Sequence, residues 1–331
     1  MQTIELQTSF FKHIKDKLAD HLSMVDVVAE LLNISNDSAY RRIRGEKTLG
    51  FDEIQILANH YKVSLDKFLH LRTETFLFSG KLINREKFEM SEYLQGIAEQ
   101  LTYFASFQNK HMYYFNKDIP IFHHFMFPEL AAFKCYFWSR YNLNYAKFNK
   151  GQFLIDDFID LFNKTGKRIS EMYLQIPSTE IWNLDCINST IMQIDYYRVS
   201  KVFSSHQDIL KVFDCLEKLV DHIEQQVEYG CKFPFSKPDL ARKVKYTVFI
   251  NDFILGDSSI IVELDDQRLV SMIHNVINYA LTTDEKFVEY SWQTMNILLK
   301  KSTLISETGE QDRQLFFDTL RERIHEKRKL A

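Results

Sequence analysis

The densest group of side chains suited to binding an anion lies in residues 36–48, NDSAYRRIRGEKT. Residues 41–47 hold four basic groups against one acid, Glu46. A guanidinium group can form paired hydrogen bonds with phosphate or guanine, an asparagine amide can pair with adenine, and a carboxylate can accept from cytosine N4. These residue types are therefore suited to contacts with a nucleic acid.

A tight turn and a short helix would position this segment. Asn33 tolerates the left-handed conformation that a sharp turn requires. Ser35 can N-cap a helix that runs from Asn36 to about Arg44, because its hydroxyl can accept a hydrogen bond from a free backbone N–H. Gly45 follows as a C-terminal stop. The polar side chains are therefore expected on one helix and on the residues directly after it.

Further helices are expected on both sides of this one. Apolar side chains recur at helical spacing in residues 9–20, in residues 24–32 after the N-cap candidate Ser23, and in residues 52–61. A short capped helix over residues 63–69 completes the series. Five short helices in about 65 residues predict a compact N-terminal bundle.

This arrangement resembles the Cro/C1-type helix-turn-helix family, the fold of phage repressors and many bacterial regulators. The resemblance covers roughly residues 10–70, and its closing segment is Lys62-Val63-Ser64-Leu65-Asp66. The other matching positions are Ala29, Leu32, Ile34, Ser35 and Gly45. The chain departs from the family pattern at Asn33, where glycine is usual, and at Ala39 and Arg42, where larger aliphatic or apolar side chains are usual.

The resemblance implies that the helix of residues 36–44 lies in the major groove of double-stranded DNA. By family position, Asn36, Asp37 and Arg41 would face the bases. Contacts with phosphates set the position of a protein on DNA rather than read its sequence. They would come from Ser38, Tyr40, Arg42, Arg44, Lys47 and Thr48. Arg42 has a second interpretation as a structural arginine.

Charge limits how strongly one such bundle could bind. The whole chain carries a net charge of −4, and residues 1–72 hold ten basic and ten acidic side chains. The positive charge is therefore local, and a single bundle should bind DNA with moderate affinity. We expect a homodimer that places two recognition helices on the same DNA.

The sequence predicts three parts: a DNA-binding domain over residues 1–72, a linker over 73–84, and a mainly helical domain over 85–331. A subdivision of the last part near residues 231–245 is an alternative. Helices are expected over residues 85–110, 128–141, 153–163, 165–174, 178–202, 207–229, 284–300 and 312–328. The apolar stripe of residues 207–229 suits either a helical bundle or a dimer seam.

Strand patterns over residues 246–254, 258–264 and 268–278 predict a small antiparallel sheet. The expected fold class is therefore mainly α: a five-helix Cro/C1-like bundle plus a larger α+β domain. Residues 111–143 are dense in aromatics, which suits either a ligand pocket or a packed core. His123 and His124 are expected on an extended segment, where neighbours point to opposite faces and chelate a metal poorly.

Several function classes are not expected. The sequence holds no nucleotide-binding glycine motif, no zinc-protease motif and no hydrolase or kinase motif, so no catalytic residue, cofactor or metal is expected. The four cysteines show no metal-ligand or paired spacing. No stretch of 18 apolar residues exists, and no secretory signal precedes the first helix. A cytoplasmic protein without membrane contact is expected.

The sequence therefore favours a sequence-specific transcriptional regulator that binds DNA. The C-terminal domain would form the dimer and could bind a small-molecule or peptide effector. The alternative is a protein-interaction or scaffold protein that uses a Cro-like bundle without binding DNA. Both hypotheses depend on the arginine-bearing helix, which would contact DNA in one and stay solvated or meet a protein partner in the other.

Overall fold

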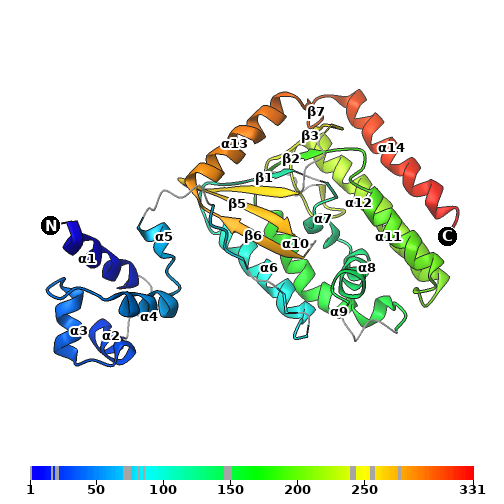
Figure 1. Ribbon diagram of the computed structural model, residues 1–331. Helices are drawn as coiled ribbons and strands as arrows, with labels where there is room; N and C mark the ends of the chain where they lie inside the picture. The colour runs from blue at the N-terminus through cyan, green and yellow to red at the C-terminus, as the bar shows by residue number, and fades with distance from the viewer. Residues whose placement is uncertain are drawn as a thin grey trace. The chain divides into compact units, whose positions relative to one another are not determined.

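The chain divides into two compact units, residues 1–77 and 78–331 (Figure 1). A computed structural model describes residues 2–15, 18, 22–69, 76–80, 83–84, 86–115, 117–144, 151–238, 244–253, 258–274 and 277–331. The protein is mainly helical, and a mixed sheet of seven strands lies in the second unit. None of the helices in these ranges is long and apolar enough to cross a membrane.

The first unit is built from short helices around a small apolar core. Their bounds are α1 (Gln2–Lys15), α2 (Met24–Leu32), α3 (Asn36–Ile43), α4 (Phe51–Tyr61) and α5 (Leu65–Phe68). Each helix from α1 to α4 contributes a fully or nearly fully buried side chain, among them Phe10, Ile14, Val28, Ala39 and Leu57. Helices this short are marginal alone, so this shared core stabilises them.

The second unit contains a sheet in the order β6-β5-β4-β1-β2-β3-β7. Its strands are β1 (Lys110–Phe115), β2 (Ser178–Trp182), β3 (Tyr246–Ile250), β4 (Ser259–Leu264), β5 (Gln267–His274), β6 (Asn278–Thr282) and β7 (Thr303–Leu304). The three strands β1, β2 and β3 run parallel, and every other pairing is antiparallel. Parallel neighbours need crossover connections, which here contain helices.

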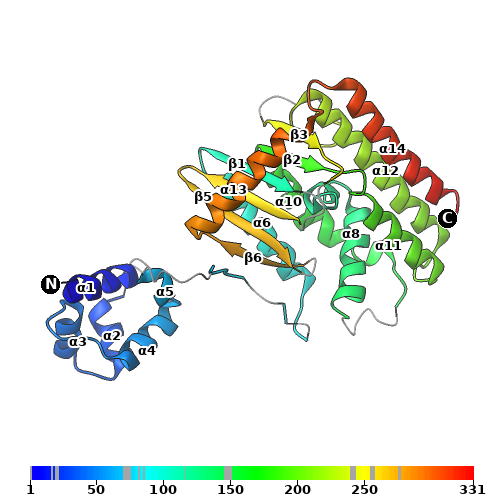
Figure 2. The same cartoon turned by 45° about the horizontal axis from the view of Figure 1, so that its top comes forward.

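Helices cover both faces of this sheet. The longest are α6 (Met90–Ala105), α8 (Pro128–Phe137), α11 (Asn188–Val199), α12 (His206–Tyr229), α13 (Glu285–Lys300) and α14 (Glu310–Arg328). Shorter helices are α7 (Ile121–His124), α9 (Ile159–Leu161) and α10 (Lys167–Tyr173), with single turns at Trp138–Asn142, Ile155–Asp157 and Phe162–Gly166. Helix α13 crosses one face, while α6, α8, α10 and α12 lie toward the other (Figure 2).

The side chains of the central strands alternate between two hydrophobic clusters. In β1, Met112 and Tyr114 join the large cluster on the side of α12, whereas Tyr113 and Phe115 join the smaller cluster beneath α13. In β2, Trp182 belongs to the large cluster and Ile181 to the smaller one. This alternation is the period of two that a strand imposes, and it leaves both faces of the central sheet buried.

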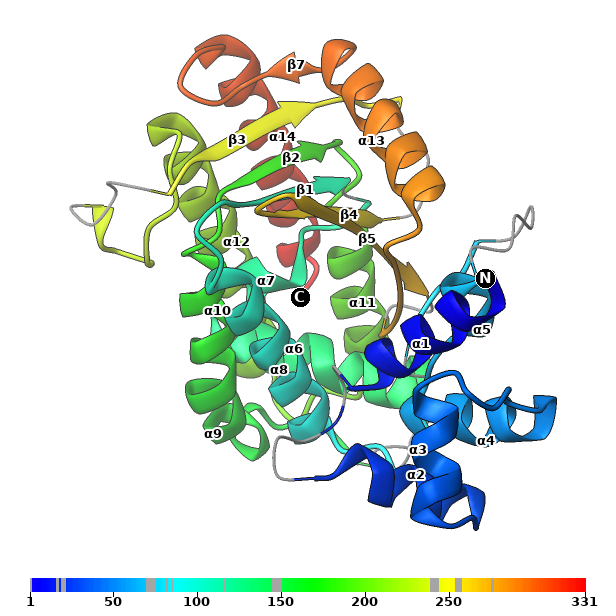
Figure 3. The ribbon, with the colours of Figure 1, turned by 90° about the vertical axis from the view of Figure 1, so that its left-hand side faces the viewer.

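The prediction of a small antiparallel sheet over residues 246–278 was wrong. Strand β3 pairs parallel with β2 and is separated from β4 by β1 and β2, as Figure 3 shows. The antiparallel hairpins β4–β5 and β5–β6 are only one edge of the larger sheet. The turn expected at residues 255–257 lies outside the described residues, as does part of the alternative boundary at 231–245.

A second error concerns residues 178–202, which were expected to form one helix. Residues 178–182 form β2, all of whose side chains are buried, and α11 begins only at Asn188. In the structure, Glu180 is fully buried and accepts hydrogen bonds from the side chains of Tyr173, Ser178, Trp182 and Tyr246.

Glu180 lies beside two other buried ionisable side chains. Its carboxylate is 3.5 Å from His123 Nε2, and Lys232 Nζ lies 3.4 Å from the centre of the Tyr173 ring. Burial alone would raise the pKa of Glu180, but His123, Lys232 and the Tyr173 hydroxyl lower it to about 2. Lys232 is itself buried, at 3% exposed.

The aromatic window of residues 111–143 contributes mainly to the core. Phe122, Phe125, Phe133 and Trp138 are buried in the large cluster, which supports the core interpretation over a ligand pocket. His123 and His124 lie on helix α7 rather than on a strand, and both are buried. The apolar stripe of α12 is also buried within the chain, so it forms part of the bundle rather than a dimer seam.

The Glu180→Gln variant should unfold at a lower urea concentration. Tyr173 and Ser178 donate to one carboxylate oxygen and Trp182 and Tyr246 donate to the other. In either orientation of the glutamine amide, its NH₂ group faces two of these donors, which then lack an acceptor. Each unsatisfied buried donor costs about 1–3 kcal/mol of stability. Tryptophan fluorescence measures this, because all three tryptophans lie in the second unit. The exposed Glu99→Gln change is the control, and equal midpoints for both variants would contradict the expectation.

Candidate nucleic-acid interface

Three residues whose roles were predicted join α2 to α3 and end α3. Asn33 has φ 51°, in the left-handed region, and its N–H reaches the carbonyl groups of Ala29 and Glu30. The Ser35 hydroxyl accepts from the N–H of Ser38 at 3.3 Å, which caps α3. Gly45, with φ 78°, turns the chain after α3. The predicted cap, turn and stop are therefore confirmed.

Helix α3 has one buried side and one polar side. Ala39 is 0% exposed, and its methyl group lies in the core of the first unit. Asn36, Tyr40 and Arg44 are four residues apart and exposed, and Asp37 and Arg41 are exposed beside them. Residues at this spacing share one helix face. The helix therefore presents to solvent a continuous polar face made of five predicted contact residues.

The remaining predicted contacts lie at the edge of this face. Ser38 is half-buried, while Lys47 and Thr48 are exposed in the segment that follows Gly45. The N–H groups of Glu46 and Lys47 both donate to the carbonyl of Arg41, at 2.8 and 3.3 Å. These bonds hold Lys47 next to the C-terminal end of α3. Eight of the nine predicted residues are thus brought to one exposed region.

Three side chains of this face form weak, solvent-exposed contacts with neighbouring residues. The Asn36 amide donates to an Asp26 carboxylate oxygen at 2.8 Å, with both side chains exposed. The Arg44 guanidinium lies 5.2 Å from the centre of the Tyr40 ring and 3.7 Å from the Glu46 carboxylate. Exposed contacts of this kind contribute little to stability and exchange readily with solvent. Arg41 forms no ion pair within the described part of the chain.

Arg42 is the ninth predicted residue, and it faces the interior. It is 5% exposed, and its Nε and Nη2 atoms donate to the two carboxylate oxygens of Glu53 at 3.0 and 2.7 Å. Its Nη1 atom donates to the carbonyl of Ser38 at 3.2 Å. A guanidinium committed to a bidentate pair is not available to a phosphate. This placement supports the structural interpretation of Arg42.

Glu53 and Gln7 support the polar face from other helices. Glu53 also accepts from the N–H of Gly50, which satisfies the start of α4. The Gln7 amide nitrogen donates to the carbonyls of Arg42 and Lys47 at 2.7 and 2.8 Å, and its oxygen accepts from the N–H of Leu49 at 2.9 Å. One side chain of α1 thus fixes both ends of the segment that carries Lys47 and Thr48.

Neither supporting residue was identified from the sequence. Glu53 accepts from the N–H of Gly50 three residues before it, which is the glutamate half of a capping box, but Gly50 has no side chain that could have marked the motif in the sequence. No local signal marks Gln7, because its partners lie 35 to 42 residues away along the chain. Its role depends on the packing of α1 beside α3.

Other chemistry is not supported by a comparable arrangement. No group of three histidine, cysteine or acidic side chains within the described ranges could hold a metal ion. The buried set around Glu180 is closed to solvent, since Glu180, His123 and Tyr246 are each 0% exposed. A substrate could not reach it without a rearrangement of the core.

Comparisons with models of protein families, with curated proteins and with solved structures yield no match for this chain. The function is therefore inferred from the chemistry and geometry of its own residues.

Replacing Arg42 with alanine should loosen the first unit, whereas replacing Arg41 should not. Arg42→Ala leaves the partly buried Glu53 without its partner, which should cost about 1–3 kcal/mol, while a surface change at Arg41 should stay within about 0.5 kcal/mol. Hydrogen exchange of peptides from α3 and α4, read by mass spectrometry, measures this, because the first unit has no tryptophan. Faster exchange in Arg41→Ala than in Arg42→Ala would contradict the assignment.

The Glu53 carboxylate should also make the first unit sensitive to acid. The hydrogen bond from Arg42 is the largest cause of a pKa below the usual value of 4.5. A lowered folded-state pKa stabilises the protein above the unfolded-state pKa, and this stability is lost as pH falls through the folded value. The difference in protection of α3 and α4 between wild type and Glu53→Gln should therefore shrink below about pH 4.5.

The measurement is the same hydrogen exchange, corrected for intrinsic rates at each pH. The exposed Glu30→Gln change on α2 is the control and should show no comparable loss. A difference between wild type and Glu53→Gln that is constant from pH 7 to pH 3 would rule out this linkage.

Proposed function

We propose that this protein is a sequence-specific DNA-binding transcriptional regulator whose first unit is a Cro/C1-like bundle. The observation that carries the proposal is the polar face of α3, which exposes Asn36, Asp37, Tyr40, Arg41 and Arg44 together. This face belongs to the second helix of a pair joined by a tight turn at Asn33. In helix-turn-helix proteins the second helix lies in the major groove.

In this proposal, residues on the exposed face of α3 read bases. Arg41 can pair with the O6 and N7 atoms of guanine, Asn36 can pair with adenine and Asp37 can accept from cytosine N4. Asn36 first has to release Asp26, an exposed partner that costs little to replace. Arg41 is already without an ion-pair partner in the described part of the chain, so it is the strongest candidate for a base contact.

The phosphate contacts come from the edge of the same face. We assign them to Ser38, Tyr40, Arg44, Lys47 and Thr48, and we assign Arg42 to the anchor with Glu53. Lys47 and Thr48 suit this role because Gln7 holds the backbone on both sides of them. A prepositioned cation loses less conformational entropy on binding than a mobile one. Phosphate contacts of this kind set register and make affinity depend on salt.

We further propose that the second unit forms a homodimer and responds to an effector. The first unit has no net excess of basic residues over residues 1–72, so a pair of bundles is needed to reach the affinities that specific regulators show. The apolar stripe of α12 is buried within the chain, and another surface of the second unit must form the contact. We expect the regulator to be cytoplasmic.

The near-neutral charge of the first unit is also the observation that favours the second candidate, a protein-interaction module. The two functions differ in their response to salt and to DNA sequence. Selection of bound sequences from a random DNA pool, with the full-length protein, separates them. A palindromic sequence would support both DNA reading and a symmetric dimer, whereas recovery of no enriched sequence would favour the interaction module.

On the selected DNA, Arg41→Ala should weaken binding by about 1–3 kcal/mol and relax the preference at one base pair. Lys47→Ala should weaken specific and non-specific binding alike and lower the slope of log K against log salt by about one. Fluorescence anisotropy between 50 and 200 mM salt would measure both. The matched control is Lys286→Ala, an exposed lysine of α13 in the second unit. Unchanged affinity and salt slope in both α3-region variants would exclude reading by this helix.

A further inference from the structure

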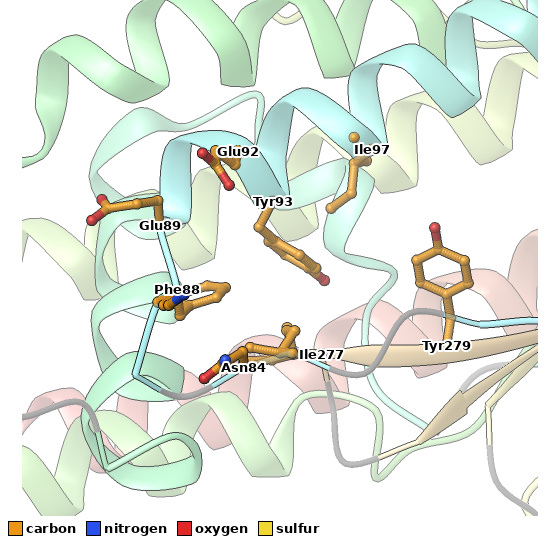
Figure 4. A pocket seen from close by; sticks show the side chains of 11 residues that line it. Asn84, Phe88, Glu89, Glu92, Tyr93, Ile97, Ile277 and Tyr279 are labelled. Carbon is orange, nitrogen blue, oxygen red and sulfur yellow. The ribbon is translucent and has the colours of Figure 1, made fainter.

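A pocket of about 340 Å³ opens in the second unit beside the first turns of α6 (Figure 4). This volume suits a small organic molecule. Its apolar lining comes from three separate stretches: the segment before α6, α6 itself, and the residues at the start of β6. The side chains are Ile83, Phe88, Tyr93, Ile97, Ile277 and Tyr279.

Gly96 lines this pocket without filling it. It lies in the interior of α6 and lines the pocket, and a Cβ atom added there would meet no atom within 4 Å. Glycine destabilises a helix interior relative to alanine. Close packing, the usual structural reason for such a glycine, is absent here. Gly96 is exposed, so the space above it is open to solvent and accessible to a ligand.

Polar groups in the pocket indicate the chemistry of that occupant. The Tyr93 ring lies across the middle of the pocket, with its hydroxyl directed toward the Ile277 and Tyr279 end (Figure 4). At the other end, Glu89 and Glu92 lie near the Phe88 ring. Glu89 is the N-cap residue of α6 but forms no side-chain cap hydrogen bond. Both carboxylates are exposed and available to a ligand.

The ionisable side chains of the rim that the structure describes carry an excess of negative charge. Among these described lining residues, Lys87 is the one base, against Glu89 and Glu92. Aromatic rings attract cations through their negative faces, and carboxylates pair with them directly. Two carboxylates would repel an anion and one exposed lysine would attract it. A cation would be attracted by both carboxylates and repelled by the lysine alone.

We propose that this pocket is a binding site for a small aromatic cation, such as an aryl-alkyl amine. Its ring lies among Phe88, Tyr93 and Ile97 above Gly96, and its ammonium group lies at Glu89 and Glu92. The site needs nothing from the first unit.

One consequence of the site rests on the proposed function. The first residues of the second unit are tied to the edge strand β6: Ser79 exchanges backbone hydrogen bonds with Leu281, and the N–H of Ile83 donates to the Asn278 side chain. Ile83 and Tyr279 also line the pocket, so a ligand that fills it adds contacts to this attachment. It therefore stabilises the chain where it arrives from the first unit, and DNA affinity should change when the ligand is bound.

The test uses full-length protein with ¹³C-labelled isoleucine methyl groups, because Ile83, Ile97 and Ile277 all line the pocket. Two probes share one ring and differ in charge: tryptamine, a cation, and indole-3-acetate, an anion. Tryptamine should shift these three methyl signals with a saturable Kd of about 1 mM, the range of a small unoptimised ligand. Indole-3-acetate should bind about tenfold more weakly or not at all.

Matched variants locate the site. Gly96→Leu should fill the pocket and weaken tryptamine binding by about tenfold or more, whereas Gln95→Leu adds the same side chain at an exposed position of α6 that does not line the pocket. The double change Glu89→Gln with Glu92→Gln keeps the pocket and should remove the preference for the cation. If the Gly96→Leu variant does not fold, the double variant Glu89→Gln with Glu92→Gln still tests the proposal.

Three results would overturn the proposal: no shift of the pocket methyl groups with tryptamine up to about 10 mM, equal binding of both probes, or equal effects of Gly96→Leu and Gln95→Leu. Binding that behaves as expected in a protein without DNA affinity would leave the site in place and refute the proposed function instead. DNA binding without tryptamine binding would refute the site alone.

Discussion

The bidentate pair between Arg42 and Glu53 fixes the orientation of α3. Two hydrogen bonds join the interior side of α3 to the first turn of α4, and the same glutamate satisfies the N–H of Gly50 at the start of that helix. A planar fork on a carboxylate resists rotation in a way that apolar packing does not. With Ala39 buried beside it, the pair determines which side chains of α3 point outward, and the candidate interface depends on that choice.

Local chemistry allowed the centre of the first unit to be predicted, and long-range pairing limited the rest. Ser35, Asn33 and Gly45 act on backbone groups a few residues away, so their types alone indicate cap, turn and stop. Gln7 acts across more than thirty residues, and nothing near it in the chain reveals that. For the same reason, the sequence left open whether the Arg42 side chain contacts phosphate or the interior of its own domain. Its position on the helix allows both until the neighbouring helix is placed.

In the second unit, the sheet was underestimated because its central strands are buried on both faces. Strand β2 lacks the alternation of a half-exposed strand, and Glu180 within it resembles a helix signal. Donors that converge from α10, β2 and β3, together with His123 and Lys232, stabilise the buried carboxylate there. Strands β4 and β5 of the edge hairpin lie close to the predicted ranges 258–264 and 268–278, and β5 is less buried than β2.

The neighbouring residues Arg41 and Arg42 lie in different environments and have different roles. One carries the helix's attachment to its own domain, and the other remains exposed beside Asn36 and Tyr40. Substitutions on the outward face therefore leave the core and its anchor intact. The outward side chains can therefore be exchanged one at a time while the packing that holds the helix in place is kept.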